Sequence, residues 1–361
     1  MSTEDLFSFL HFVDSITDMD LRTTIKPQLL RRRAQFFQNY SDQDFFKRYR
    51  MTKHTVLFVL DQINEELEFD SDRNGSVAPV EQLLIALRFY GTGTHLQIIA
   101  DDHGVSVPTA SRVVKKVSKA IVKLQPKYIQ MPSSAEEIDH CQREFFDIAK
   151  FPFVIGCIGC THIKIQSPGK DHNGKIFRNR KGYFSVNLQT VCDAKLKVRY
   201  VAHGPGSTHD AAIYINSQLH RDFEMGVYGG SCLLADSQFP FKRYLLTPYL
   251  QPNTVPQEQY NHSHIMTRNI VERLHEMLKR RFPALAVGLR INLQTAVDLI
   301  VSCCILHNIC IDKGEDLPPN EMDISYADTN IQNEQIDHNH HDQNYGYYDD
   351  GRTIITNNFF S

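Results

Sequence analysis

The segment between residues 231 and 279 constrains the fold more than any other, because it places acids on two different kinds of element. Residues 231–236 read Ser-Cys-Leu-Leu-Ala-Asp, which predicts a short buried strand with Asp236 at its carboxyl end. Residues 268–279 have apolar side chains at a spacing of three and four, which is typical of an amphipathic helix and includes Glu272. Carboxylates from separate elements are the ligands that two-metal phosphoryl-transfer sites use. Asp236 and Glu272 are therefore the first candidates for metal ligands.

Length and charge indicate more than one core and local basic patches. The chain has 361 residues, of which 42% are hydrophobic, and a formal net charge of −3, which is enough for two domains and a tail. Basic residues dominate several middle segments, so nucleic-acid binding would depend on local patches. The eight cysteines lie mostly in apolar runs, which indicates buried thiols and no disulfide framework. We recognise no signal peptide and no apolar run long enough to span a bilayer, and we expect a soluble intracellular protein.

Two helical regions, residues 1–69 and 70–150, are predicted ahead of the first strand. In the second, residues 96–117 predict a short helix, a turn at Gly104 and a second helix opening at Ser106, which matches a helix-turn-helix. The second helix of that motif enters the major groove of DNA. The residues expected close to DNA are Ser106, Thr109, Arg112, Lys115 and Lys116. A plain helical hairpin without DNA contact is the alternative.

Residues 151–311 predict an α/β domain. Their pattern is strand, strand, strand, helix, strand, helix, which is the order of a ribonuclease-H-like domain with acids converging from strand ends and the last helix. From residue 312 to 361 the chain is poor in apolar residues and rich in acids, which predicts a disordered tail.

Several phrases of this second half, taken in order, resemble the PIF/Harbinger superfamily of transposases and the nucleases derived from them, which have DDE endonuclease domains. The phrases lie at residues 156–163, 183–193, 206–210, 234–240, 246–249, 260–261, 268–282 and 306–308. The helical front is similar too, so the resemblance covers nearly everything before residue 312.

The resemblance implies an Asp-Asp-Glu triad that binds a divalent metal, Mg²⁺ or Mn²⁺. Its second and third acids correspond to Asp236 and Glu272, but Gly159 stands where the family phrase has its first aspartate. Asp210 is a further acid of the family pattern, which lines the site or replaces a ligand; the alternative role is to cap the helix that follows. Asp193, at the end of the next strand, is the nearest substitute by sequence, although a different strand seldom reaches the same spot.

The implied function is metal-dependent hydrolysis or strand transfer at DNA phosphodiester bonds, with activity weakened or lost because glycine has no side-chain oxygen. The alternative is a catalytically inactive DNA-binding or regulatory protein that keeps the fold. Family members work with a Myb-like (SANT-like) partner, so DNA, such a partner and a nuclear location are implied, with the cytoplasm left open. No membrane association is expected, and the oligomeric state is not predicted.

Basic residues near the domain could follow a DNA backbone. Those selected are Arg178, Lys181 and Lys279, with ordinary surface charge as the alternative. Cys157 and Cys160 form a CxxC without a second ligand pair, which favours core thiols over zinc. His307 lies in a wholly apolar helix, where we expect it to be hydrogen-bonded and not bound to metal.

Overall fold

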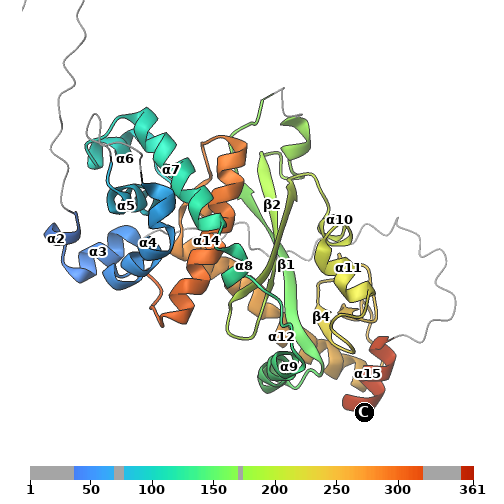
Figure 1. Ribbon diagram of the computed structural model, residues 1–361. Helices are drawn as coiled ribbons and strands as arrows, with labels where there is room; N and C mark the ends of the chain where they lie inside the picture. The colour runs from blue at the N-terminus through green and yellow to red at the C-terminus, as the bar shows by residue number, and fades with distance from the viewer. Residues whose placement is uncertain (1–35, 69–76, 170–173, 320–350) are drawn as a thin grey trace, which may run out of the picture. The chain divides into compact units, whose positions relative to one another are not determined.

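The computed structural model describes residues 36–68, 77–169, 174–319 and 351–361 (Figure 1). Most of the predicted tail and about half of the predicted region 1–69 therefore lie outside the described residues. The elements ahead of the sheet are α2 (Phe36–Asn39), α3 (Asp42–Tyr49), α4 (Lys53–Leu67), α5 (Pro79–Tyr90), α6 (Leu96–Asp102), α7 (Val107–Val122), α8 (Gln125–Tyr128) and α9 (Ala135–Ala149). The remaining elements are β1 (Val154–Lys164), η1 (Gly174–Phe177), β2 (Ser185–Cys192), β3 (Val198–Pro205), α10 (Asp210–Ile215), α11 (Gln218–Glu224), β4 (Cys232–Leu234), β5 (Leu245–Leu246), α12 (Val255–Arg281), α13 (Ala284–Val287), α14 (Leu293–Asp312) and α15 (Gly351–Phe359).

The sheet has five strands in the order β3-β2-β1-β4-β5. β2 is antiparallel to β1 and β3, whereas β4 runs parallel to β1 and β5 parallel to β4. Every residue of β2 is buried, so both faces of the sheet are covered at its centre. The result is a mixed α/β domain that is consistent with a DDE endonuclease domain, and it confirms the predicted fold class at this level.

The helix that carries Glu272 is longer than its apolar periodicity indicated. α12 begins at Val255, after an N-cap at Thr254 whose side chain accepts a hydrogen bond from the Gln257 amide. The amino-terminal half escaped prediction because its inward-facing residues are polar. Tyr260 and His264 are buried, and they bond to the carbonyl oxygens of Thr247 and Leu246 beside β5. These bonds attach α12 to the strand edge that precedes it.

The predicted short helix, turn and second helix are present as α6 and α7. Gly104 has a φ of +62° in the turn, a backbone conformation that glycine adopts without strain. Ser106 is the N-cap of α7 and accepts a hydrogen bond from the Thr109 amide. α7 also packs on α14, from the other end of the chain, where Ser302 Oγ donates to the Ser118 carbonyl at 2.9 Å. The helical region and the sheet thus share a core.

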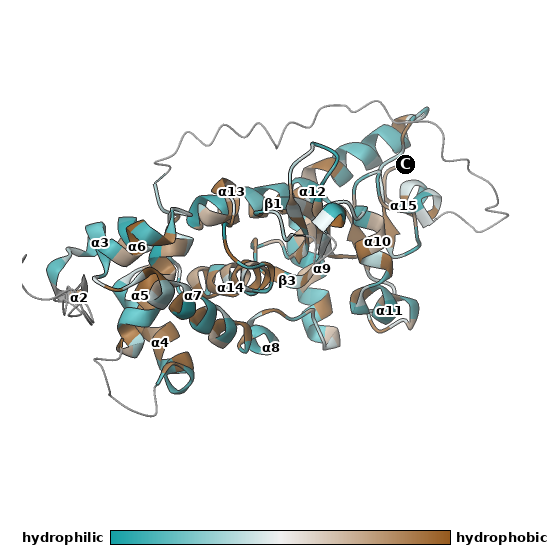
Figure 2. Ribbon diagram, turned by 90° about the horizontal axis from the view of Figure 1, so that it is seen from above, coloured by the Kyte–Doolittle hydropathy of each residue, from teal (hydrophilic) through white to brown (hydrophobic). Residues whose placement is uncertain are grey.

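α14 is apolar along most of its length (Figure 2). In length and composition it could cross a membrane, contrary to our reading that no such run exists, but 83% of the relevant window is buried inside the protein. The helix therefore serves as a core element, because its apolar side chains are already covered by other parts of the chain.

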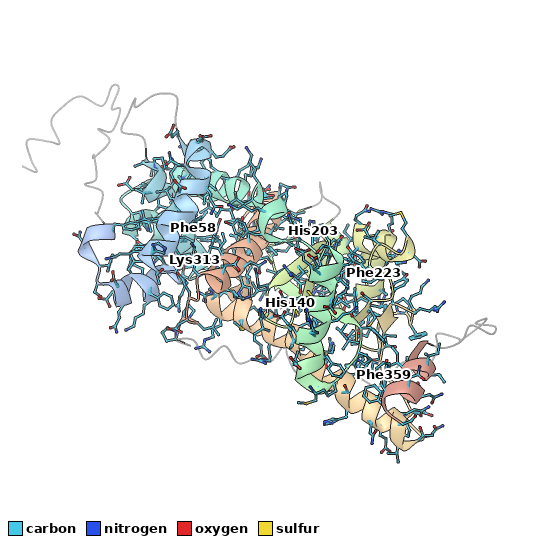
Figure 3. The ribbon with its side chains drawn as sticks, turned by 60° about the horizontal axis from the view of Figure 1, so that its bottom comes forward. Phe58, His140, His203, Phe223, Lys313 and Phe359 are labelled. Atoms are coloured by element: carbon cyan, nitrogen blue, oxygen red, sulfur yellow. The ribbon has the colours of Figure 1, made fainter. Side chains whose placement is uncertain are left out.

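The expectation of disorder from residue 312 onward does not hold for residues 312–319 or 351–361. Lys313 Nζ lies 3.7 Å from the centre of the Phe58 ring (Figure 3). Glu315 accepts from the Thr52 amide at the start of α4, and it pairs with the buried Arg281 of α12 at 3.4 Å. The composition of the segment could not predict these contacts, because each joins one charged side chain to a residue far away in the sequence and none depends on an apolar pattern.

Candidate active site

Asp236 and Glu272 lie on either side of one guanidinium group. Arg268 Nη2 is 3.2 Å from Asp236 Oδ2 and 2.7 Å from Glu272 Oε1. Arg268 and Glu272 are four residues apart on α12, a spacing that places their side chains together. Asp236 follows β4, and its Oδ1 accepts from the Gln238 amide. The structure therefore brings the two predicted acids together, with a positive charge between them.

The electrostatics of Asp236 reflect this arrangement. Burial raises the pKa of Asp236 above its ordinary value, and the nearby negative charge of Asp210 acts in the same direction. The Arg268 guanidinium opposes both effects and favours the ionised carboxylate. Arg268 thus compensates the charge of an acid that is partly removed from water.

Gly159 faces α12 at the position next to Glu272. A Cβ atom at residue 159 would lie 2.9 Å from Val271 Cγ1 and 3.5 Å from His275 Cε1. Carbon atoms do not approach to 2.9 Å without a shift of the neighbour, and Val271 is a stiff, fully buried residue. An aspartate at this position therefore requires Val271 or α12 to move.

The other wall at Gly159 is a neutral imidazole. His275 is 2% exposed, and burial lowers its pKa to about 3. Its Nε2 shares a hydrogen bond of 2.9 Å with Thr190 Oγ1, and Thr190 is the β2 residue paired with Gly159. Its Nδ1 is 4.0 Å from Glu272 Oε2. The space beside Gly159 is thus lined by Val271 and the uncharged His275.

Asp210 lies at the start of α10, and its charge acts on Asp236. It follows the N-cap residue His209 and begins α10, so it stands in the first turn and is not the cap itself. Its Oδ1 accepts from Asn187 Nδ2 at 2.7 Å. Burial chiefly raises the pKa of the Cys160 thiol, and the negative charges of Asp210 and Asp236 add to this effect. Asp210 therefore adds negative charge near Asp236.

Asp193 is engaged elsewhere. Its carboxylate accepts from the Lys195 and Lys197 amides at 3.0 and 2.9 Å, and Arg199 Nε is 3.2 Å from its other oxygen. Along β2 it lies three residues beyond Thr190, which corresponds to about 10 Å. These contacts fix the carboxylate in the turn between β2 and β3, away from Gly159.

The acids do not fit the three-acid metal centre that the resemblance implies. Over residues 36–68, 77–169, 174–319 and 351–361, no three His, Cys, Asp or Glu side chains are grouped so that they could hold a metal ion. Asp236 and Glu272 are the two acids brought together, and Arg268 lies between them.

The residues predicted to contact DNA fall on separate elements. Arg112 and Lys115 are exposed on α7, and Arg178 and Lys181 are exposed in the loop before β2. Lys279 is half-buried near the end of α12. These positions leave the predicted DNA contacts open to test.

Lys116 has a structural contact that its sequence position did not indicate. Its Nζ donates to the carbonyl oxygens of Leu67 and Glu68 at 2.9 and 3.0 Å. The last carbonyls of a helix have no partner within the helix, so Lys116 satisfies the end of α4.

Cys157 and His307 lie in the core, as their apolar surroundings in the sequence predict. Cys157 is buried, with its Sγ 3.4 Å from the Thr267 carbonyl oxygen, and all eight cysteines are free thiols. His307 is buried, and its Nε2 donates to the Leu196 carbonyl at 2.9 Å. The CxxC residues face different neighbours, since Cys160 Sγ accepts from Gln189 Nε2.

Three residues that shape the site were not predicted for their roles. Arg268 could have been found from its spacing of four from Glu272, which is typical of an ion pair on a helix. Val271 and His275 gave no such signal, because their role depends on how closely α12 approaches β1.

Comparison with known proteins agrees with this geometry. Residues 158–308 match the DDE superfamily endonuclease family. The chain is 31% identical to the Mus musculus protein named Putative nuclease HARBI1 over 77% of this chain and 80% of that protein. It is 30% identical to the Homo sapiens protein of the same name, with the same coverage, and 28% identical to Protein ALP1-like of Arabidopsis thaliana over 67% of this chain and 63% of that protein. No solved structure matches the chain. On this likeness, the chain belongs to the family of Harbinger transposase-derived nucleases, within the DDE superfamily of endonucleases.

Proposed function

We propose that this protein is a DNA-binding member of the nuclease family in which metal-dependent cleavage of phosphodiester bonds is weakened or lost. The observation that carries the proposal is the lack of room for a side chain at Gly159, where a Cβ atom would lie 2.9 Å from Val271 Cγ1. Family membership supports a nuclease-like role, and this lack of room explains why the full chemistry is not expected.

The chemical argument depends on the number and placement of anionic groups. In a triad site, divalent ions stabilise the attacking and leaving oxygens of the phosphodiester, and each acid helps to hold them. Here the first position has no oxygen and no free space, while the single positive charge of Arg268 offsets part of the negative charge of the other two acids. Displacement at phosphorus tolerates little misplacement, so the loss of one ligand lowers the rate strongly.

DNA binding is supported by the family and by the exposure of basic side chains. Arg112 and Lys115 project from α7, whose amino-terminal turns would face the groove in a helix-turn-helix. Contacts of such side chains with phosphates would make binding weaken as salt rises. A Myb-like partner, a nuclear location and Mg²⁺ or Mn²⁺ as the preferred ion remain proposals that depend on the resemblance.

The experiment compares binding and cleavage by the same full-length protein. DNA binding is measured by gel shift at low salt without divalent ions, and nicking of supercoiled plasmid is measured with Mg²⁺ or Mn²⁺. We expect the protein to shift DNA and to nick no faster than its Glu272→Gln variant.

Two results would count against the proposal. Rapid nicking by the unmodified protein that disappears in Glu272→Gln shows that catalysis is neither weakened nor lost, and loss of that nicking in Asp210→Asn as well would identify Asp210 as the substitute acid. Failure to bind DNA at low salt, alone or with a Myb-like partner, removes the DNA-binding part.

A further inference from the structure

The C-terminal helix α15, drawn in red in Figure 1, carries the labelled Phe359 of Figure 3. It packs against aromatic side chains that come from three separate parts of the chain. This group, called the aromatic cradle below, consists of Phe151, Phe153, Phe241, Tyr249 and Tyr260. Two of its members precede β1, two lie between β4 and α12, and Tyr260 is on α12. The cradle thus joins segments that the chain places far apart.

The end of the chain contributes two phenylalanines to this contact. The Phe359 ring meets the Phe153 ring edge to face, with centroids 5.5 Å apart. The Phe360 ring lies 5.8 Å from that of Phe151 and 5.9 Å from that of Tyr260. Aromatic rings attract one another at such separations beyond the effect of their buried area.

The other end of α15 makes polar and cation–π contacts. The Arg352 guanidinium carbon is 4.3 Å from the Phe241 ring centre and 5.0 Å from that of Tyr249. Arg352 Nη1 donates to the Pro248 carbonyl at 3.4 Å, and the hydroxyls of Thr356 and Tyr249 share a hydrogen bond of 3.0 Å. Cation–π contacts over the faces of aromatic rings are attractive and favour arginine.

The contacting residues of α15 follow the period of a helix. Arg352, Thr356 and Phe359 are separated by four and three positions, so they lie along one face of α15, and Phe360 follows directly after the helix. Amphipathic helices that bind grooves are recognised through this spacing. The helical spacing of the contacting residues and the arginine together define the kind of helix that the aromatic cradle can bind.

α15 contributes one apolar residue, Ile355, to the main core, and most of its other side chains lie at the surface. Ile355 and Thr356 are the buried residues of this helix, whereas Phe359 keeps 47% of its surface exposed. A helix of this length is not stable by itself in water, so its helical form depends on the cradle. The segment therefore resembles a bound peptide more than a core element.

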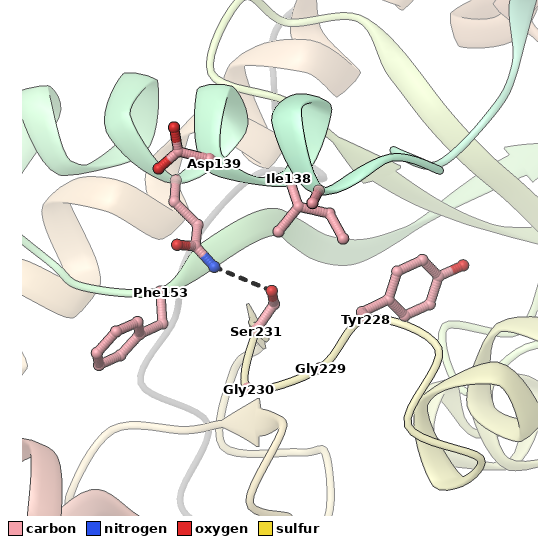
Figure 4. Close-up of a pocket in the computed structure, with 9 residues that line it drawn as sticks. Ile138, Asp139, Phe153, Tyr228, Gly229, Gly230 and Ser231 are labelled. Atoms are coloured by element: carbon pink, nitrogen blue, oxygen red, sulfur yellow. Dashed lines mark hydrogen bonds between the residues drawn. The ribbon is translucent and has the colours of Figure 1, made fainter.

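Phe153 has an unusual backbone conformation with a positive φ angle. Its φ is +64°, a conformation that bulky residues rarely adopt, and its ring is 42% exposed. The same ring borders a groove of about 480 Å³, whose wall includes Ile138 and the Gln142 to Ser231 hydrogen bond (Figure 4). Phe153 is thus held outward, where it meets both the groove and Phe359.

We propose that the aromatic cradle is a recognition site for a short amphipathic helix and that the chain's own residues 351–361 are its occupant. The recognised pattern is an arginine followed, seven and eight residues later, by two phenylalanines. Residues 320–350 connect this ligand to the body. Release of the helix exposes the cradle without unfolding the body.

The experiment uses the full-length chain with a sequence-specific protease site inserted within residues 320–350. The folded protein is cut, and the fraction of C-terminal fragment that remains with the body is measured by size exclusion over a dilution series. The variants are Phe359→Ala/Phe360→Ala and Arg352→Ala. Thr353→Ala, at an exposed position of the same helix, is the matched control.

We expect the cut fragment to stay bound and to obey one dissociation constant. Phe359→Ala/Phe360→Ala should weaken binding at least about tenfold and Arg352→Ala about threefold, whereas Thr353→Ala should change it less than about twofold. The circular dichroism of the body should stay unchanged when the fragment leaves.

Three results would overturn the proposal. One is a fragment that separates from the body even at about 100 µM protein. Another is retention of the double phenylalanine variant with unchanged affinity. The third is unfolding of the body on loss of the fragment, which would make α15 part of the core.

Discussion

Val271 Cγ1 lies 2.9 Å from the point that a Cβ atom of residue 159 would occupy, so α12 packs closely on β1 at this glycine. Under the proposed function, residue 159 is the first-acid position, which then lacks both an acid and the room for one. Reversal of the substitution alone is therefore not expected to restore the site.

The contact predicts a steric penalty for any side chain at residue 159. Gly159→Ala should lower the free energy of unfolding by about 1–3 kcal/mol, because it overpacks the interface with Val271. In Gly159→Ala/Val271→Ala the two changes should couple favourably by about 1 kcal/mol. Urea unfolding measures both, and Gly230→Ala, where a Cβ meets nothing within 4 Å, is the control. If the Gly159→Ala protein is as stable as the Gly230→Ala protein, α12 moves without cost and the predicted steric penalty is absent.

Arg268 is predicted to stabilise the fold through its two carboxylates. Arg268→Gln should lower the free energy of unfolding at neutral pH by about 1–2 kcal/mol, a value reduced from that of buried pairs because both acids are partly exposed. Arg273→Gln, at an exposed position of the same helix, should change it little. Equal effects of the two substitutions in urea unfolding would argue against the bridging role.

Some features of the site were readable from local pattern, and others were not. Asp236 and Glu272 were found because a buried strand and an amphipathic helix have periods that sequence alone reveals. The amino-terminal half of α12 was missed because Tyr260 and His264 are polar and are buried through bonds to carbonyl oxygens. The contact of Gly159 with Val271 depends on the distance between two elements, which no local pattern encodes.

Buried histidines predict that the protein loses stability in mild acid. Burial lowers the pKa of His264 and that of His307 to about 4, below the ordinary value of 6.5. Between those values the unfolded chain binds more protons than the folded chain, so stability is present near neutrality and falls as pH drops from about 6.5 toward 4. Urea unfolding at several pH values measures the slope. His307→Gln should reduce that slope, and an unchanged slope would contradict the assignment.

The α7 surface predicts which basic residues contribute to DNA affinity. Arg112→Ala and Lys115→Ala should each weaken binding and reduce the salt slope by about one unit. Lys119→Ala, at the far end of the same helix, should leave binding unchanged. Fluorescence anisotropy at several salt concentrations provides the measurement, and equal effects at all three positions would contradict docking through the start of α7.

Lys116 should behave differently from these neighbours, although it lies one residue after Lys115. Because its Nζ donates hydrogen bonds to two carbonyl oxygens at the end of α4, Lys116→Ala should lower the free energy of unfolding by about 1 kcal/mol. A loss of DNA affinity at unchanged stability would instead identify Lys116 as a contact residue.

Val271 leaves no room for a side chain at residue 159, the position that the proposed function assigns to the first metal ligand. The decisive measurement is the rate of Mg²⁺- or Mn²⁺-dependent nicking of supercoiled plasmid by full-length Gly159→Asp, Val271→Ala and Gly159→Asp/Val271→Ala proteins. We expect the double variant to nick DNA faster than either single variant, and we expect a further Glu272→Gln change to abolish this gain. Nicking by the unmodified protein at the rate of the double variant would contradict this expectation.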